Sequence, residues 1–353
     1  MVSAFVLLPS KDGLAVHAFT AAAPCQALWK VPGTSITTAR VSTDGEHLGV
    51  LDQAGKRATV YRMSPDGPQR LAPPITLPKG VVGDVVALHG ATLYAAAPSR
   101  TPAIYAMIDG AWHARLLPGQ ALKCGKRVDE LLLDGSRMIA VDNIVAPKFF
   151  IVFDIASDGT LSEGVLIDLP VRSAYEHVRF AALGERWVAV SSHGSNRAGD
   201  SEHLALFDRA NLVEHACISR EVHHSARRSV FDTEPPVVRP PKAPWTGLAF
   251  AGNDCLYIGW GVEGLGVLHL EGYSPGDLPH REASDSWYDP RWVTQTPIPL
   301  VRMRLEAPVV GVVTVPGQRG CFVLFPGPQF RWLEPEEIVS GGEVIPRGAE
   351  ITF

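Results

Sequence analysis

Short apolar runs and turn residues alternate along nearly the whole chain. The runs are rich in Val, Leu, Ile and Phe and are bounded by Asp-Gly, Pro-Gly or Gly-x pairs. Runs of this kind predict β-strands joined by tight turns. Few segments show the spacing of an amphipathic helix, so the pattern predicts an all-β protein.

The runs follow a repeating order of strand, tight turn, strand, loop, strand and turn. The first clear unit is "ARVSTDGEHLGVLDQAGKRATVYRMSPDG", and most units add a fourth, weaker run such as "TLSEGVLIDLP". Six such units occupy residues 39–67, 84–110, 129–159, 176–211, 246–273 and 301–328. A four-stranded unit that recurs every 40–50 residues or so is the signature of a β-propeller.

The two ends of the chain supply a seventh unit. The N-terminal segment gives three strands, and "GAEITF" at residues 348–353 is expected to add the innermost one. Closing the ring with strands from both termini would remove an open sheet edge. We therefore expect residues 1–353 to form a single propeller domain of seven four-stranded blades.

The segments "VSTDGEHLGVLD", "VFDIASDGTL" and "LALFDRAN" resemble the seven-bladed β-propeller superfamily in the broad WD40 and YVTN-like sense. The resemblance covers nearly the whole chain. No Gly-His and Trp-Asp pair, kelch Gly-Gly or sialidase-type Asp box accompanies it. The resemblance implies a fold and no particular activity.

Composition and charge narrow the function classes. The net charge of −5 argues against nucleic acid as the partner.

The N-terminal apolar run has no basic residue before it and is broken by Lys11 and Asp12, which predicts a strand and not a signal peptide. No apolar run approaches the length of a membrane span, and five scattered cysteines give no disulfide framework or zinc knuckle. We expect a cytoplasmic protein, and the Ala, Gly, Pro, Arg and Val content suggests a bacterial source.

The loops between the second and third strands of the units define what we call the top face. Basic residues are assigned to these loops in most units, whereas Asp and Glu fill the turns of the opposite face. Asp before Gly is ordinary turn chemistry, but tight turns do not require Lys or Arg. The expected basic residues of the top face are Lys56, Arg57, Arg100, Lys148, Arg197 and Arg319.

Three connections are longer than the usual two to six residues or so. They span 192–203, about 219–245 and about 281–299, and all three are assigned to the top face. The second contains five prolines and is interpreted as an insertion between blades, although a plain surface loop remains an alternative. Candidate binding residues in the last two are Arg220, His223, His224, Arg227, Arg228, Trp287, Tyr288 and Trp292.

No nucleophile elbow, P-loop, dinucleotide fingerprint or metalloprotease motif is present. Ser192 and His193 are neighbours in an extended segment, so their side chains point to opposite faces and do not form a nucleophile and base pair. Arg302 and Arg304 are interpreted as a channel-facing pair that would bind an anion. The carboxylates and histidine expected at the channel mouth, and suited to a divalent cation, are Asp84, Glu130, Glu176 and His177.

The leading hypothesis is therefore a non-catalytic scaffold or accessory subunit that binds a protein or peptide, such as an acidic segment, through the basic top face. It assigns no cofactor and no metal. The alternative is a metal-dependent hydrolase or lactonase that acts at the mouth of the central channel.

Overall fold

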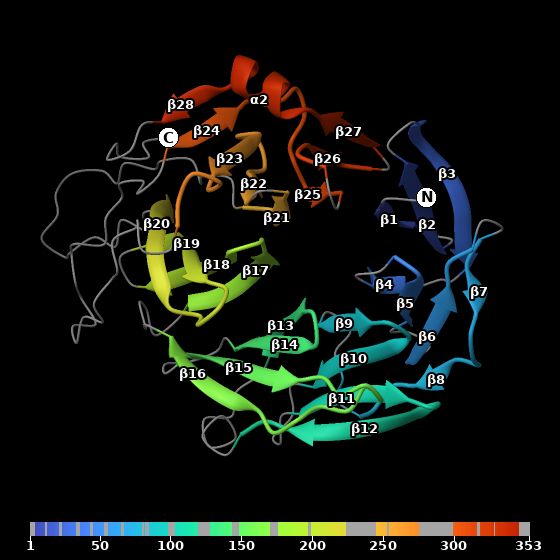
Figure 1. Cartoon of the computed structure of the whole chain (residues 1–353). Helices are drawn as coiled ribbons and strands as arrows, with labels where there is room; N and C mark the ends of the chain where they lie inside the picture. Colours follow the sequence, from blue (N-terminus) through green and yellow to red (C-terminus); the bar gives the residue numbers. More distant parts are fainter. Residues whose placement is uncertain are drawn as a thin grey trace, which may run out of the picture. The chain divides into compact units, whose positions relative to one another are not determined.

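The computed structural model consists almost entirely of β-strands (Figure 1). It describes residues 4–345 with the exception of 11–12, 21–22, 33–35, 43–44, 53–55, 65–66, 80, 82–84, 98–102, 119–127, 143–147, 170–175, 197–198, 224–244, 253, 275–298, 316–317 and 328. The chain divides into two compact units. Unit 1 comprises Met1–Asn143 and Phe149–Asp168, and unit 2 comprises Ile144–Lys148 and Leu169–Phe353.

Unit 1 is built from four sheets, each of consecutive strands. The first sheet contains β1 (Ala4–Ser10), β2 (Gly13–Thr20) and β3 (Ala23–Pro32). The second contains β4 (Ile36–Val41), β5 (His47–Asp52), β6 (Arg57–Arg62), β7 (Gln69–Arg70) and β8 (Ile75–Thr76). The third contains β9 (Val86–His89), β10 (Thr92–Ala97), β11 (Ala103–Ile108) and β12 (Ala111–Leu116). The fourth contains β13 (Val128–Asp134), β14 (Arg137–Asp142), β15 (Lys148–Asp154) and β16 (Val165–Leu169).

Unit 2 is built from three sheets. One contains β17 (Glu176–Leu183), β18 (Trp187–Asn196), β19 (Gly199–Asp208) and β20 (Glu214–His223). The next contains β21 (Gly247–Ala251), β22 (Cys255–Gly259), β23 (Leu265–His269) and β24 (Leu300–Met303), with β28 (Glu343–Ile345) added outside β24. The last contains β25 (Gly311–Thr314), β26 (Cys321–Phe325) and β27 (Gln329–Leu333), and the short helix α2 (Pro335–Gly341) follows it.

Tight turns of Asp and Gly connect the strands as the sequence predicts. Between β11 and β12, Ile108 pairs with Ala111, so the turn consists of Asp109 and Gly110 alone. Both residues have positive φ, 48° and 78°, as a two-residue hairpin turn of type I′ requires. Asp and Gly accept this backbone conformation at little cost, which explains why the pair recurs along the chain.

Apolar side chains are buried between neighbouring sheets within each unit. In unit 2, the facing sides of the β17–β20 and β21–β24 sheets share a core that contains Trp187, Trp245 and Trp260, all at most 2% exposed. In unit 1, the sheets β9–β12 and β13–β16 enclose a second core that includes Tyr94 and Phe153. The first strands of the sheets pack side by side, in the order β1, β4, β9, β13 in unit 1 and β17, β21, β25 in unit 2. The prediction of an all-β propeller is confirmed.

The predicted number of blades is not confirmed. Hydrogen bonding gives seven sheets, but two of them, β1–β3 and β25–β27, have three strands instead of four. The structure is counted as six blades and not the predicted seven. The strand proposed to close the ring, at 348–353, lies outside the described residues. The last described strand, β28, instead pairs with β24 through Leu300↔Ile345, Val301↔Val344 and Arg302↔Glu343.

Three details of the predicted strand order are corrected. Residues 300–303 do not open a sixth unit; they form β24, the fourth strand of the preceding sheet, so Arg302 is not in a channel-facing strand. The connection predicted at 192–203 is mostly β-structure, because β18 and β19 run to Asn196 and from Gly199 in continuous register. Arg220 and His223 belong to β20 and not to a loop. No helix in the described ranges is long and apolar enough to cross a membrane.

Candidate functional site

The expected basic residues of the top face are only partly placed by the structure. Lys56 and Arg57 are exposed where β5 is joined to β6, and Lys148 begins β15. Arg100 and Arg197 lie outside the described residues, as do His224, Arg227, Arg228, Trp287, Tyr288 and Trp292. Their contribution to a binding surface therefore stays a prediction from the sequence.

Arg319 does not lie where the sequence pattern placed it. It is in the connection between β25 and β26, the first and second strands of their sheet, and so belongs with the acidic turns of the opposite face. Its Nη2 donates to both carboxylate oxygens of Glu271, at 3.0 and 3.1 Å. Its carbonyl oxygen accepts a hydrogen bond from the Tyr257 hydroxyl at 2.5 Å. The sequence pattern places residues 301–304 at the start of this sheet, which shifts each later strand by one position and moves Arg319 to the top face; in the structure, Leu300–Met303 belong to the preceding sheet.

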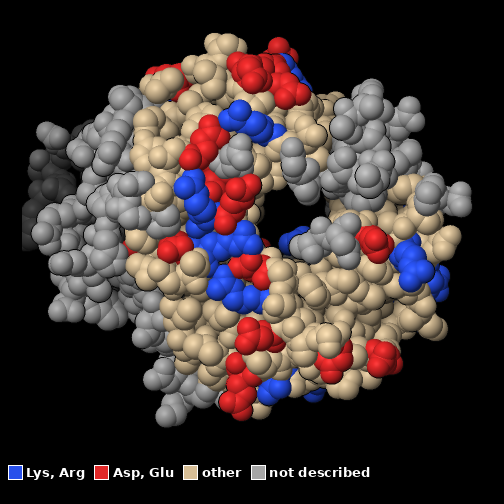
Figure 2. Space-filling view, viewed as in Figure 1, with Lys and Arg blue, Asp and Glu red and all other residues tan. Residues whose placement is uncertain are grey.

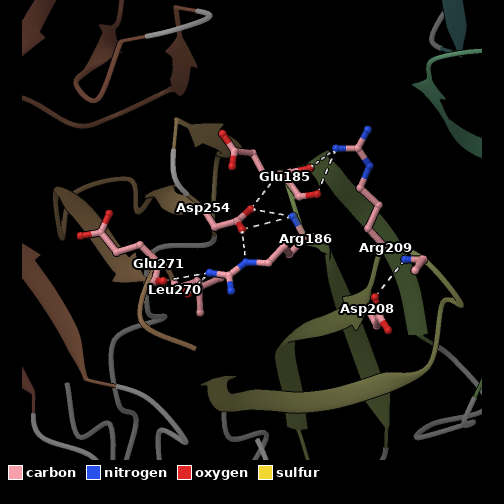
Figure 3. Close-up of polar contacts among 9 residues, drawn as sticks. Glu185, Arg186, Asp208, Arg209, Asp254, Leu270 and Glu271 are labelled. Carbon is pink, nitrogen blue, oxygen red and sulfur yellow. Dashed lines mark hydrogen bonds and ion pairs between the residues drawn. The ribbon is translucent and has the colours of Figure 1, made fainter. Parts of the chain in front are cut away.

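The turns of unit 2 on that opposite face carry a mixed charge instead of a purely acidic one. Asp254, 1% exposed, accepts hydrogen bonds from the main-chain N–H groups of Glu185 and Arg186 and from Arg186 Nε (Figure 3). Arg186 Nη2 reaches the carbonyl oxygen of Glu271 at 2.8 Å, and Arg209 Nη1 reaches that of Gly184 at 2.6 Å. Figure 2 shows positive and negative side chains intermingled over unit 2. Because its members satisfy one another, we interpret this network as a structural link between two sheets.

The other end of unit 2 is more unusual, and we call it the top end: its described residues are Asn196, Gly199, Trp245, Thr246, 260–264 and 304–310. Strands β18, β19 and β20 have 10 residues each, whereas β22 and β23 in the next sheet have 5. The additional residues extend the β17–β20 sheet by about 17 Å at a rise of about 3.3 Å per residue. Polar residues in this extension are buried: Ser192 is 9%, Glu202 1% and His203 5% exposed.

A buried carboxylate fixes the point at which the chain returns from the insertion. Both oxygens of Glu202 accept a hydrogen bond from the main-chain N–H of Trp245, at 3.1 and 3.2 Å. Arg179 Nη1 lies 3.7 Å from Glu202 Oε1 and supplies the opposite charge that a buried carboxylate requires. The chain leaves the sheet at His223, which pairs with Asp200, two residues from Glu202. His223 and Trp245, the described residues on either side of the insertion, are therefore both bonded to the same part of β19, two residues apart.

The return point is also bonded to the neighbouring loops. The Thr246 hydroxyl donates to the carbonyl oxygen of Val309 at 2.9 Å, and the Val309 N–H donates to the carbonyl oxygen of Gly261 at 2.8 Å. The top end of unit 2 is thus continuous from Glu202 to the loop between β22 and β23. The sequence pattern indicated a long insertion here, but Glu202 was not among the predicted site residues. The signal that could have found it is the alternating run "EHLALF", in which Glu202 falls on the same face as Leu204 and Leu206.

Ser191, His193 and Glu202 share one face of the β17–β20 sheet, since Ser191 and His193 are two residues apart and His193 pairs with Glu202. This arrangement superficially resembles a nucleophile, base and acid. However, Ser191 is only 1% exposed, and the Glu202 carboxylate is engaged by Trp245 and Arg179. The structure therefore gives Ser191 no access to a substrate.

The structure does not test the alternative metal site, because its candidate residues are divided between two units and the undescribed part of the chain, so the site stays a prediction from the sequence. Glu130 is in β13 of unit 1, where its Oε1 accepts the N–H of Leu131 at 3.2 Å, whereas Glu176 and His177 begin β17 of unit 2. Asp84 lies outside the described residues. Among the residues that are described, no three His, Cys, Asp or Glu side chains are grouped so as to hold a metal ion.

Two buried cysteines lie between the β21–β24 and β25–β27 sheets. Burial raises the pKa of Cys255 to about 11 and raises the pKa of Cys321 well above its usual range. Cys255 Sγ lies 3.8 Å from His269 Nδ1. Because the thiolate is the reactive form, these thiols are suited to packing and not to nucleophilic chemistry.

Neither a protein-family model nor a curated protein matches the sequence. Among solved structures, the chain is similar to Kuenenia stuttgartiensis hydrazine synthase, with a TM-score of 0.58, 15% identity, and coverage of 94% of this chain and 92% of that one. It is similar to Hsv2 of Kluyveromyces lactis with a TM-score of 0.55, 10% identity, and coverage of 92% and 87%. The periplasmic gluconolactonase PpgL of Pseudomonas aeruginosa gives a TM-score of 0.55, 16% identity, and coverage of 95% and 91%. At such identities the likeness shows the fold alone: the chain is an all-β propeller.

Proposed function

We propose that this protein is a non-catalytic β-propeller that binds another protein or a peptide, and that the top end of unit 2 is its main binding surface. The observation that carries the proposal is the extension of β18, β19 and β20, together with the Glu202–Trp245 contact that ends the insertion. The residues that flank 224–244, His223 and Trp245, are both bonded to β19. Binding segments positioned by a rigid scaffold are a common arrangement in binding proteins.

The composition of the insertion supports a partner with acidic residues. Arg220 in β20 and Arg227 and Arg228 in the insertion are basic, and the prolines that follow favour an extended backbone. A proline-rich segment loses less conformational entropy on binding than a flexible one, so its ordering costs less affinity. The solved structures of similar fold include both an enzyme, the gluconolactonase, and Hsv2, so the fold does not decide between catalysis and binding.

The test is a deletion that keeps both attachment points. Residues 225–242 are replaced by a short Gly-Ser linker, and the purified wild type and variant are each used as bait in the native host, with recovered proteins identified by mass spectrometry. A protein recovered by the wild type is then produced and its affinity for both forms is measured by calorimetry. We expect the deletion to abolish binding while circular dichroism and tryptophan fluorescence stay unchanged.

The matched control is Arg70→Ser, which changes an exposed arginine on β7 of unit 1 that is not part of the top end. This variant should bind as the wild type does. Equal affinity of the wild type and the deletion variant would refute the assignment of the surface. Turnover of a lactone or ester substrate by the wild type, lost after treatment with a chelator, would refute the proposal of a non-catalytic protein.

A further inference from the structure

Two exposed valines stand out at the top end of unit 2. Val262 is 65% exposed in the loop between β22 and β23, and Val310 is 48% exposed immediately before β25. Pro308 is exposed as well. Single exposed apolar residues are common on protein surfaces, so the significance of these valines depends on the groups around them.

Main-chain hydrogen bonds hold both valines in fixed positions. The turn that carries Val262 is closed by Trp260 N–H to the Gly264 carbonyl oxygen at 2.9 Å and by Glu263 N–H to that of Trp260 at 3.0 Å. On the other loop, Val309 N–H donates to Gly261 and Val310 N–H donates to Leu324, each at 2.8 Å. The valines are therefore held on two loops that are bonded to each other. Apolar groups fixed in this way lose little entropy when a partner covers them.

The charged groups beside the valines differ in whether they are already paired. Arg302 Nη1 and Nη2 face Glu263 and Glu343 at 3.9 and 2.5 Å. Arg304 is exposed and makes no ion pair with the residues the structure describes, and Glu306 is exposed two residues further along. Arg304 is thus the cation available at this edge of the patch, with Glu306 as a nearby charge that would weaken its attraction for an acid.

We propose that Val262 and Val310 form the apolar anchor of the partner-binding surface, and that the partner segment presents an aliphatic or aromatic side chain next to an Asp or Glu that pairs with Arg304. The inference rests on the proposed function and adds the chemistry of the partner. The inference is based on the connection between the valine loops and the end of the insertion. Thr246, which directly follows Trp245, donates a hydrogen bond to the carbonyl oxygen of Val309. The two valine loops and the point at which the chain re-enters the sheet, Trp245 and Thr246, therefore belong to one hydrogen-bonded surface.

The experiment uses random peptides displayed on phage and selected against the full-length protein. We expect the selected peptides to combine one large apolar residue with Asp or Glu. Synthetic copies are then titrated, by fluorescence anisotropy, with the wild type and with the double variant Val262→Ser/Val310→Ser. The double variant should bind about tenfold more weakly, as expected for removal of a central apolar contact.

Three further variants make the test specific. Val165→Ser changes a valine that is 62% exposed on β16 of unit 1 and should leave affinity unchanged. Arg304→Glu should weaken the binding of acidic peptides, and Glu306→Lys should strengthen it, both more at low salt than at high salt. All of these positions are exposed, so thermal melting should confirm that each variant is folded.

The outcomes separate this inference from the proposed function. If the double variant binds the peptides as tightly as the wild type, or if the selected peptides lack a large apolar residue, the valine anchor is wrong. If the deletion of 225–242 still abolishes recovery of a partner, the proposed function stands without it. If neither the deletion nor the double variant changes binding, both are overturned.

Discussion

Replacing Asp254 by Asn tests the network that links the β17–β20 and β21–β24 sheets. The Asp254 carboxylate is 1% exposed and accepts hydrogen bonds from Glu185 and Arg186. Asn has the same shape, keeps one acceptor oxygen and tolerates the positive φ of 58° at this position. The substitution therefore removes the charge and one acceptor while the backbone of the turn stays unstrained.

The expected loss of stability comes mainly from the main-chain donors. The Arg186 side chain is 42% exposed, so solvent screens its attraction to Asp254, and this part contributes about 1 kcal/mol or less. Two buried N–H groups that lose a charged acceptor cost about 1–3 kcal/mol. We expect Asp254→Asn to lower the free energy of unfolding by about 2 kcal/mol. Asp254→Ala, which leaves both main-chain N–H groups without an acceptor and puts alanine at a positive φ, should lower it by about 3–5 kcal/mol.

Equilibrium urea unfolding followed by tryptophan fluorescence measures this loss, because Trp187, Trp245 and Trp260 are buried between the same two sheets. Asp109→Asn is the matched control: Asp109 also has positive φ, 48°, but is exposed, so its substitution should have no measurable effect. An Asp254→Asn variant within about 0.5 kcal/mol of the wild type would refute the assigned role, since that is the range of ordinary surface substitutions.

Three other predictions concern the backbone, pH and metals. Gly264 has φ +97° and its added Cβ would lie 2.1 Å from the Met303 carbonyl oxygen, so Gly264→Ala should cost about 3 kcal/mol or more in urea unfolding. Gly110→Ala, at φ +78° with nothing within 4 Å, should cost about 1 kcal/mol, and equal losses for the two would contradict the clash. Burial raises the pKa of Cys255 from 9.0 to about 11, and burial with the Asp158 carboxylate raises the pKa of Tyr94 from 10.0 to about 12. Both groups are neutral when protonated, so their contribution to stability is complete below the unfolded pKa values and is lost as pH rises from 9 towards 12. Tyr94→Phe should flatten the part of this loss above pH 10, and a variant with the wild-type slope would contradict the assignment. Adding Ca²⁺, Mg²⁺, Mn²⁺ or Zn²⁺ should leave the melting temperature unchanged, whereas a concentration-dependent rise would favour the metal-dependent hydrolase.

Strand positions and turn types were largely predictable because they depend on neighbouring residues. The alternation of apolar residues and the Asp-Gly pairs, such as Asp109 and Gly110, define hairpins whatever the rest of the chain does. The assignment of strands to sheets was less secure. Residues 300–303 are separated from β23 by a long connection, and nothing local indicates that they pair with Leu265–Leu268 and not with the strands that follow them. The wrong location of Arg319 followed directly from that ambiguity.

The sequence predicted where the candidate site lies in the chain but not the contacts that form it. The length and proline content of the insertion marked one end of the β17–β20 sheet, but Glu202 and Trp245 are 43 residues apart in the sequence. A contact over such a separation depends on how two sheets pack, and a single sequence carries no local signal for it. Val262 was visible only indirectly, as part of the loop "GVEGLG", which has no basic residue.

The pairing of β28 with β24 has a consequence for the order in which the protein is completed during synthesis. The outer edge of β24 is covered by residues 343–345, which follow the whole of the β25–β27 sheet in the chain. A nascent chain that has already folded β21–β24 must therefore wait for some forty further residues before that edge is protected (Figure 1). During this interval, the outer edge of β24 is open to strand pairing with a neighbouring chain.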